Sequence, residues 1–232
     1  MTLQLQRNQT PEKANLPKSW IRQRKRDYYY RKAKEEKFRS RAAYKLLQTV
    51  EKYKFIKSGD IVVDLGAAPG GWIQAARKVV GEKGFVLGVD IKPIEPFEEE
   101  NILTIIADIT DPKTPENIRN LLPRPADVVI SDVSPKISGI WEVDHARQID
   151  LAINSMKLAC KVLKPKGNFF VKVFEGDLLK DFVDKLKENF SAVKLVKPKA
   201  SRARSSEMYI LALGLKKQAT NSKAKLRTNN LM

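Results

Sequence analysis

Short apolar runs recur along the chain and alternate with longer stretches that have amphipathic helical spacing. Buried parallel strands are continuous runs of Val, Ile and Leu, whereas half-exposed strands alternate apolar and polar residues. Strands that alternate with helices are typical of a doubly wound α/β fold with a mostly parallel sheet. The runs that predict such strands are residues 61–65, 85–89, 102–107, 126–131 and 168–174.

The stretches between these runs predict helices, and the last part of the chain predicts two more strands. These strands, at residues 192–196 and 207–214, are separated only by the basic loop 197–206. Such a loop is too short for the helical crossover that joins parallel neighbours, so one of the two is expected to be antiparallel. A seven-stranded sheet results. Helices are expected at about residues 40–53, 71–80, 114–121, 144–163 and 177–189, the fourth ended by Pro165 and Gly167.

The composition indicates one large domain between two polar ends. The chain has 232 residues, enough for a single domain with a full hydrophobic core. Residues 1–18 are expected to form a basic, flexible tail, and residues 216–232 a basic, disordered one. The domain between them, residues 19–215, is expected to begin with a basic helical segment that reaches about residue 37.

Several kinds of protein and site are disfavoured by the chain. Its longest apolar runs are strand-sized and its start is polar, so neither a membrane-spanning helix nor a signal peptide is expected. The single cysteine, Cys160, excludes a disulfide framework and a thiolate metal cluster, and it is expected in the core. His145 has no Cys or His nearby, so no metal site is expected. A cytoplasmic location is the default for such a chain.

Charge is the strongest feature of the composition. Lysine and arginine number 44 against 27 acidic residues, which gives a formal net charge of +17. The basic residues gather within residues 18–45 and 194–204. A lysine-rich solvated surface would not require this clustering, whereas a polyanionic partner would favour it. The chain is therefore expected to bind a polyanion.

Four of the apolar runs end in an aspartate, namely Asp64, Asp90, Asp108 and Asp132. Open α/β sheets bind ligands outside the carboxyl ends of their strands. The row of acids therefore predicts one binding crevice at that edge. A further run carries Lys172 in its middle, and a charge inside a strand is costly unless it is paired.

The first predicted strand leads into a glycine-rich loop, residues 64–72 (DLGAAPGGW). Its spacing matches neither the dinucleotide fingerprint nor the phosphate loop, so dinucleotide and ATP binding are disfavoured. Asp90 is placed to accept hydrogen bonds from ribose hydroxyls, and Asp108 to reach an adenine. A ribose-bearing cofactor without a pyrophosphate fits this set, and S-adenosylmethionine is the obvious candidate. The alternative is a tight turn whose acids cap helices.

Five motifs in order resemble the FtsJ/RrmJ family of RNA ribose 2′-O-methyltransferases. They are residues 38–46 (FRSRAAYKL), 63–72 (VDLGAAPGGW), 131–135 (SDVSP), 171–174 (VKVF) and 201–209 (SRARSSEMY). The resemblance covers about residues 20–214 and implies a Rossmann-like fold that binds S-adenosylmethionine. It also implies a catalytic tetrad of Lys45, Asp132, Lys172 and Glu207. Carried over by motif, the cofactor contacts are Gly70, Trp72, Asp90, Asp108 and Asp132, with Gly66 shaping the loop.

The resemblance implies methylation of a ribose 2′-hydroxyl in RNA. The bacterial members, of RlmE type, methylate a uridine of large-subunit ribosomal RNA, so ribosomal RNA or the large subunit is the expected partner. A tRNA 2′-O-methyltransferase and a non-catalytic RNA-binding ribosome-assembly factor remain alternatives. A small-molecule methyltransferase is disfavoured by the charge.

Lys172 is the candidate proton acceptor from the attacking 2′-hydroxyl. A lysine accepts a proton only when it is neutral. Apolar surroundings and a nearby Lys45 cation would favour the neutral form, whereas Asp132 and Glu207 would favour the charged one. Lys172 alternatively stays charged and orients or stabilises the oxygen, or forms a purely structural ion pair.

Aromatic residues lie among the basic ones near the start of the domain: Trp20, Tyr28, Tyr29 and Tyr30. On an RNA-binding surface they would stack on splayed bases. Core packing is an equal alternative for Trp20 and one of the tyrosines.

Overall fold

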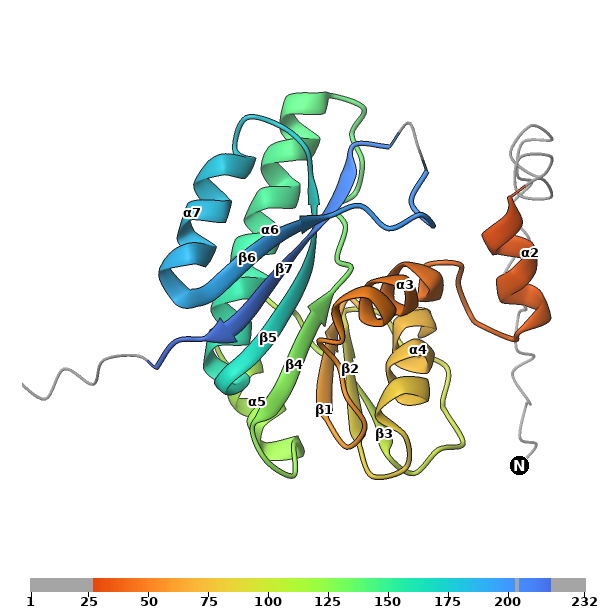
Figure 1. The fold of residues 1–232 in the computed structure, drawn as a ribbon. Helices are drawn as coiled ribbons and strands as arrows, with labels where there is room; N and C mark the ends of the chain where they lie inside the picture. Colours follow the sequence, from red (N-terminus) through yellow and green to blue (C-terminus); the bar gives the residue numbers. More distant parts are fainter. Residues whose placement is uncertain (1–26, 203–204, 218–232) are drawn as a thin grey trace, which may run out of the picture.

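The computed structural model describes residues 27–202 and 205–217 (Figure 1). Within this part of the chain, one seven-stranded sheet has the order β3-β2-β1-β4-β5-β7-β6. β7 is antiparallel to both of its neighbours, and the other pairs are parallel. The predicted fold class is confirmed, including the one antiparallel strand. The strands are β1 (Ile61–Leu65), β2 (Phe85–Asp90), β3 (Ile102–Ile106), β4 (Ala126–Ser131), β5 (Leu163–Phe174), β6 (Phe190–Val196) and β7 (Glu207–Leu215).

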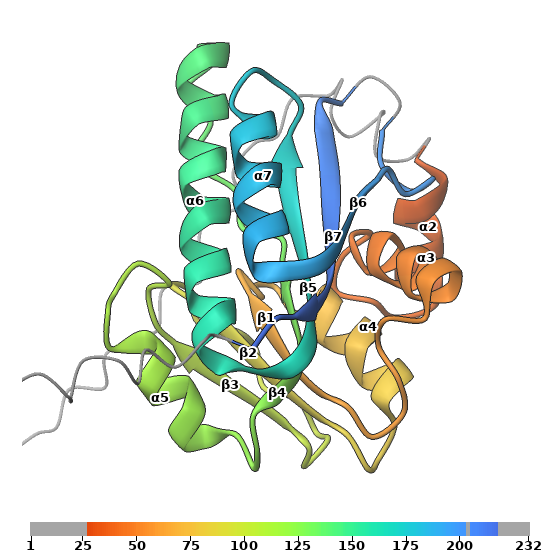
Figure 2. The ribbon, with the colours of Figure 1, turned by 60° about the vertical axis from the view of Figure 1, so that its left-hand side comes forward.

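Helices cover both faces of the sheet (Figures 1 and 2). The apolar sides of α3 and α4 form a core with one face, and those of α5, α6 and α7 form a core with the other. α2 lies outside the first layer and packs on α3 through Ala33 and Tyr44. The described helices are α2 (Tyr28–Glu35), α3 (Ala43–Tyr53), α4 (Gly71–Val80), α5 (Thr114–Leu121), α6 (Trp141–Val162) and α7 (Leu179–Asn189).

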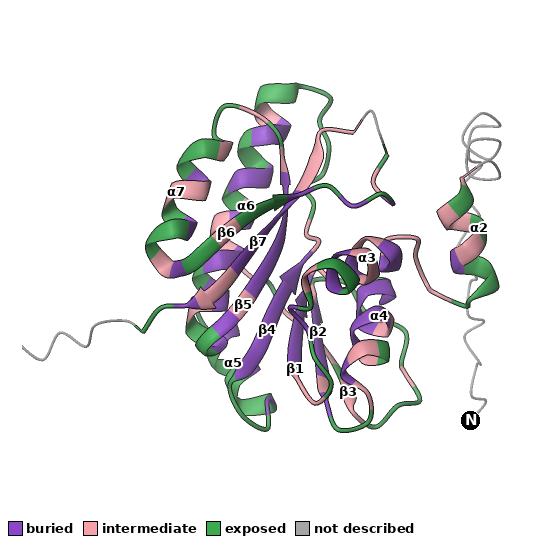
Figure 3. Ribbon diagram, viewed as in Figure 1, coloured by how far each residue is buried: buried purple, intermediate pink, exposed green. Residues whose placement is uncertain are grey.

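The central strands are continuous apolar runs because both of their faces are covered (Figure 3). Successive side chains of a strand point to opposite faces of the sheet. In β1, Val62 packs into the α3/α4 core and Val63 into the α5/α6/α7 core, and both are fully buried. Cys160 lies in α6 and packs against the second of these cores, as predicted.

The long helix ends about where it was predicted, but it begins three residues earlier, and the strand after it begins at Leu163 instead of residue 168. α6 begins at Trp141 and ends at Val162, and Pro165 and Gly167 lie inside β5. Leu163 pairs with Ala126, after which the register shifts so that Asn168 is opposite Val128. The intervening residues 164–166 are exposed. A proline is tolerated there because a bulged strand leaves residues outside the hydrogen-bonded ladder.

Several predictions fall outside the described residues. The tail at residues 1–18, the start of the basic helical segment with Trp20, and the second tail beyond residue 217 are among them. Among the described helices, none is long and apolar enough to cross a membrane. In the same part of the chain, no cluster of His, Cys, Asp and Glu is placed to hold a metal ion.

Candidate functional site

A cavity of about 480 Å³ opens where β1, β2, β3 and β4 end. Four of the predicted cofactor residues line it: Gly66, Asp90, Asp108 and Asp132. The sequence reasoning missed the apolar part of the wall, which comes from residues adjacent to the predicted acids. That part includes Ala68, Ile91, Ala107, Ile109, Val133 and Pro135.

The glycine-rich loop after β1 is packed too closely for side chains at two positions. Gly66 has a φ of +74°, and a Cβ there would lie 2.7 Å from the side chain of Val133. Gly70 has a φ of +109° and precedes α4; a Cβ there would lie 2.7 Å from the ring of Phe97. Both φ values favour glycine. The loop therefore lets backbone, rather than side chains, border the cavity.

The two acids that follow β2 and β3 are held in fixed orientations. Asp90 accepts hydrogen bonds from the backbone N–H groups of Ala68 and Lys92, each at 2.9 Å. One oxygen of Asp108 accepts from the N–H and the hydroxyl of Thr110, both at 2.8 Å. A carboxylate has about four acceptor sites, so both acids retain capacity for ribose hydroxyls and an adenine amine. Together with the apolar wall and the cavity volume, these residues fit S-adenosylmethionine.

Asp64, the first acid of the predicted row, does not reach the cavity. It lies one residue before the end of β1 and is completely buried. Neither carboxyl oxygen has a hydrogen-bond partner among the described residues. Burial, and then the nearby Asp132 and Asp90, raise the pKa of Asp64 well above its ordinary value. The row of acids at the sheet edge is therefore a row of three, and Asp64 is a buried carboxyl group whose surroundings favour the neutral form.

Trp72 and Gly70 do not line the cavity either. The Trp72 ring is buried and stacks on Phe170, with ring centroids 5.6 Å apart. Its Nε1 donates to the carbonyl oxygen of Ala42 at 2.7 Å. These contacts fix the start of α3 against α4. The structure thus gives Trp72 a packing role, and direct contact of Trp72 or Gly70 with the cofactor stays a prediction.

The four residues of the predicted tetrad come together from four elements. Lys45, in α3, forms an ion pair with Glu207, the first residue of β7. Lys172, near the end of β5, is 5% exposed. Its Nζ donates to the backbone carbonyl of Asp132 at 2.7 Å and lies 3.2 Å from that residue's Oδ1. The buried lysine is therefore paired, as its position in a strand requires.

Tyr209, which the sequence reasoning did not single out, joins these two ion pairs. Its hydroxyl accepts from Lys45 Nζ at 3.1 Å and donates to Asp132 Oδ1 at 2.9 Å. Burial, and then the carboxylates of Asp132 and Glu207, raise the pKa of Tyr209 well above its ordinary value. The hydroxyl therefore keeps its proton. Its position follows from strand geometry, because Tyr209 shares a face of β7 with Glu207 and pairs with Lys172 across the ladder.

Asp132 belongs to both parts of the site. It follows β4, where its backbone N–H donates to the carbonyl of Leu65 at 3.2 Å. It lines the cofactor cavity and also receives Lys172 and Tyr209. The tetrad therefore adjoins the cavity.

The segment between β4 and α6 exposes apolar side chains beside the cavity residues Ser134 and Pro135. Ile137 and Ile140 are each 59% exposed, and Trp141 is 44% exposed. Asp144 fixes the segment by accepting hydrogen bonds from the N–H and hydroxyl of Ser138, both at 2.8 Å. The ring of Trp141 stacks on His145 and on Phe174 of β5.

Comparison with solved structures identifies the class of enzyme. Aeropyrum pernix fibrillarin, solved with natively bound S-adenosylmethionine, has the same fold at a TM-score of 0.52 and 18% identity, over 75% of each chain. A structure from Plasmodium falciparum assigned as a ribosomal RNA methyltransferase gives a TM-score of 0.68 at 25% identity, covering 77% of this chain and 98% of that one. The fold and cavity define an S-adenosylmethionine-dependent methyltransferase.

The chain belongs to the FtsJ-like methyltransferase family, whose model matches residues 38–215. The ribosomal RNA large subunit methyltransferase E of Methanocaldococcus jannaschii is 51% identical over 198 residues, 84% of this chain and 81% of the relative. The protein of that name from Methanobrevibacter smithii is 48% identical over 206 residues, 89% of this chain and 98% of the relative. The resemblance drawn from the five motifs is confirmed.

Proposed function

We propose that this enzyme methylates a ribose 2′-hydroxyl of large-subunit ribosomal RNA, with a uridine as the target. The observation that carries the proposal is the placement of Lys172 beside Asp132, which lines the cofactor cavity. The similarity to enzymes named ribosomal RNA large subunit methyltransferase E supports the choice of RNA. The net charge of +17 supports a polyanionic substrate. A cytoplasmic location, where ribosomal RNA is accessible, belongs to the same proposal.

The cavity residues would hold and orient the cofactor, which supplies a methyl group on a positively charged sulfur. Asp90 would accept from the ribose hydroxyls, and Asp108 would accept from the adenine amine through its second oxygen. The apolar wall around Ile91 and Ile109 would exclude water from the purine. Such positioning is worth most when donor and acceptor atoms are held in line.

Lys172 is proposed to contact the attacking 2′-oxygen and to accept its proton. An ammonium group has three donors. One of them donates to the carbonyl of Asp132, and the charge is paired with Oδ1 of the same residue. Donor capacity is therefore left for a substrate hydroxyl. A lysine accepts a proton only when it is neutral, so this role requires Lys172 to lose one proton before the reaction. Asp132 Oδ1, at 3.2 Å, is positioned to take part in that transfer.

The other members of the tetrad would act by holding Asp132 and Lys172 in place. Tyr209 donates to Asp132, and Lys45 contacts both Tyr209 and Glu207. Ser201, from the loop before β7, also donates to Glu207 at 3.3 Å. This ties the basic loop to the proposed catalytic groups. The exposed Trp141 and the isoleucines near it would contact bases of the bound RNA.

A tritium-transfer assay tests the proposal. The full chain would be incubated with labelled S-adenosylmethionine and with large ribosomal subunits, isolated ribosomal RNA or bulk tRNA, each from a strain that lacks the enzyme. The expected product is labelled 2′-O-methyluridine from the ribosomal samples, absent with Lys172→Ala. Label in tRNA alone would overturn the choice of substrate. Cofactor binding without transfer to any pool would favour the assembly-factor alternative.

A further inference from the structure

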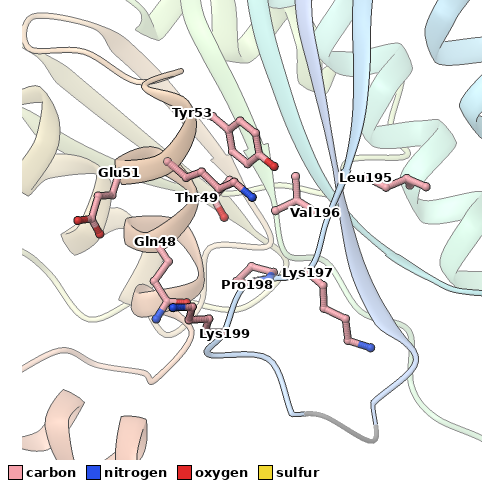
Figure 4. A pocket seen from close by; sticks show the side chains of 10 residues that line it. Gln48, Thr49, Glu51, Tyr53, Leu195, Val196, Lys197, Pro198 and Lys199 are labelled. Carbon is pink, nitrogen blue, oxygen red and sulfur yellow. The ribbon is translucent and has the colours of Figure 1, made fainter.

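A second cavity, of about 610 Å³, lies between α3 and the end of β6, outside the site described above (Figure 4). Its walls come from the last two turns of α3, which include Gln48 and Tyr53, and from residues 195–199. Neither the catalytic tetrad nor the residues of the cofactor cavity line it. The proposed reaction therefore leaves this cavity without a role.

The charge around this cavity is strongly positive. Lys52, Lys197 and Lys199 line it, and Lys194 projects over the ring of Tyr53 at its edge. Glu51 is the acidic residue in the lining. Among the described residues, the ion pairs involve neither Lys52, Lys194 nor Lys199. The rim therefore carries positive charge that the described part of the protein does not neutralise.

Two ammonium groups from different elements converge on one aromatic ring. The Nζ of Lys52 lies 5.1 Å from the centroid of Tyr53, and the Nζ of Lys194 lies 5.4 Å from it. Attraction to the ring holds both cations beside the cavity. An anion bound there would meet positive charge from two elements. The chemistry favours a phosphate group as the ligand.

The cavity and the proposed active site lie along the same helix, α3. Lys45, Gln48 and Lys52 are at positions i, i+3 and i+7 of α3, and so lie along one side of the helix. At a rise of about 1.5 Å per residue, Lys52 is about 10 Å from Lys45 along the axis. Gln48 binds the basic loop by accepting from the N–H of Ala200 at 2.9 Å.

The other wall also leads to the active site. Lys197 donates to the carbonyl of Ser205 at 2.9 Å, which joins the two ends of the loop that precedes Glu207. A strand bound at Lys172 and leaving along α3 would therefore pass over this cavity. A phosphodiester chain that spans the roughly 10 Å from Lys45 to Lys52 along α3 would reach both sites.

We infer that the cavity between α3 and β6 is a second RNA-binding site, which holds phosphates of the substrate strand outside the target nucleotide. This inference rests on the proposed function, because it takes the polyanion to be the RNA that is methylated. Lys52 and Lys194 supply the charge, and Tyr53 positions them. The site would add affinity without reading sequence, since phosphate contacts carry no base information.

The test compares Lys52→Gln/Lys194→Gln with the matched control Lys157→Gln/Lys185→Gln. The control lysines are exposed on α6 and α7, on the opposite face of the sheet. Glutamine keeps most of each side-chain stem and removes the charge. Binding to a short single-stranded oligouridylate would be measured at several salt concentrations, and KM and kcat with undermethylated large subunits.

The cavity variant is expected to raise the KM for RNA on the order of tenfold, the value for two exposed charge contacts. The slope of log affinity against log salt should fall by about 1.4, since each single-strand phosphate contact contributes about 0.7. The kcat at saturating RNA and the cofactor affinity should match the control. Lys52→Arg/Lys194→Arg should retain both affinity and slope.

Equal KM values and salt slopes for the cavity variant and its control would overturn the inference while leaving the proposed function intact. A wild-type chain that neither binds nor methylates RNA would overturn the proposed function, and the inference with it. The two failures are therefore distinguishable.

Discussion

The hydroxyl of Tyr209 donates to Oδ1 of Asp132 at 2.9 Å, and the same oxygen lies 3.2 Å from Nζ of Lys172. One carboxylate oxygen thus receives both a neutral and a charged donor. This fixes the rotation of the Asp132 side chain and, through it, the position of the lysine. Because Tyr209 is completely buried, solvent does not compete for its hydroxyl.

Tyr209→Phe is expected to lower kcat while leaving cofactor affinity nearly unchanged. The phenylalanine keeps the stacking on Phe170, so the fold should persist. Loss of the hydroxyl leaves Lys45 and Asp132 each with one partner fewer, a cost of about 1–3 kcal/mol in a buried network. If the whole of this free-energy cost raised the activation barrier, kcat would drop about five- to 150-fold.

Steady-state kinetics and cofactor titration would check this expectation. An unchanged kcat would remove Tyr209 from the positioning network. A shifted pH profile of kcat, with unchanged cofactor affinity, is the result that a purely structural role would not give.

Lys172→Ala and Lys172→Arg test whether this residue accepts a proton. Arginine keeps the positive charge but does not deprotonate in proteins. If Lys172 is the general base, both variants should lose about 10²–10⁴-fold in kcat. Single-turnover assays with saturating cofactor and RNA measure this loss directly. An arginine variant within about tenfold of wild type would instead assign Lys172 to electrostatic stabilisation.

Asp90→Asn should weaken cofactor binding more than it affects turnover at saturating cofactor. The amide retains one acceptor oxygen but loses the charge, and a charge-assisted hydrogen bond contributes about 1.5–3 kcal/mol. The expected loss in affinity is thus about tenfold or more. Asp111→Asn serves as control, because Asp111 is exposed and lies outside the cavity lining. Calorimetry with the cofactor would contradict the assignment if both variants bound it equally.

The stability of Asp64→Asn relative to wild type should increase as the pH rises. The folded-state pKa of Asp64 is raised, whereas the unfolded value is about 3.9. Between these values the folded chain binds more protons than the unfolded chain, so wild-type stability falls with increasing pH. The asparagine does not titrate, so the stability of the variant lacks this dependence on pH.

Denaturant unfolding across about pH 5–8 would show the difference between wild type and Asp64→Asn widening. The control is Asp144→Asn. Hydrogen bonding, first from the Ser138 N–H, lowers the pKa of Asp144, so this carboxyl titrates below the unfolded value of about 3.9 and the difference between Asp144→Asn and wild type should stay constant over this range. Asp144 stabilises the fold above its unfolded pKa, and that contribution is lost as the pH falls. A pH-independent difference for Asp64→Asn would mean that Asp64 is ionised in the fold.

Much of the fold could be predicted because the central strands are buried on both faces, which leaves unbroken apolar runs such as residues 85–89. The antiparallel strand could be predicted from the length of the loop at residues 197–206. The start of β5 could not be predicted, because Pro165 and Gly167 are typical helix terminators and because the register shift depends on pairing with β4. Local residue preferences carry no information about such a partner.

Only part of the candidate site could be predicted, again because the local sequence does not show which residues meet across the sheet. The motifs placed Asp132 and Lys172 beside each other, as observed. The pattern of acids at the strand ends did not distinguish Asp64, one residue short of the end of β1, from the three acids that line the cavity. Tyr209 was overlooked because an aromatic residue in an apolar strand resembles a core residue. The role of its hydroxyl becomes evident only from the strand register, which pairs Tyr209 with Lys172.

The reversed direction of β7 brings two parts of the site, from different parts of the sheet, to the same edge. Because β7 runs against the other strands, its beginning meets their ends, and Glu207 and Tyr209 arrive at the edge where the cofactor cavity opens. The first half of the sheet can thus keep a constant methyl-donor site, while the loop that enters β7 varies with the acceptor. Exchange of that loop between relatives should move substrate choice and leave the donor site untouched.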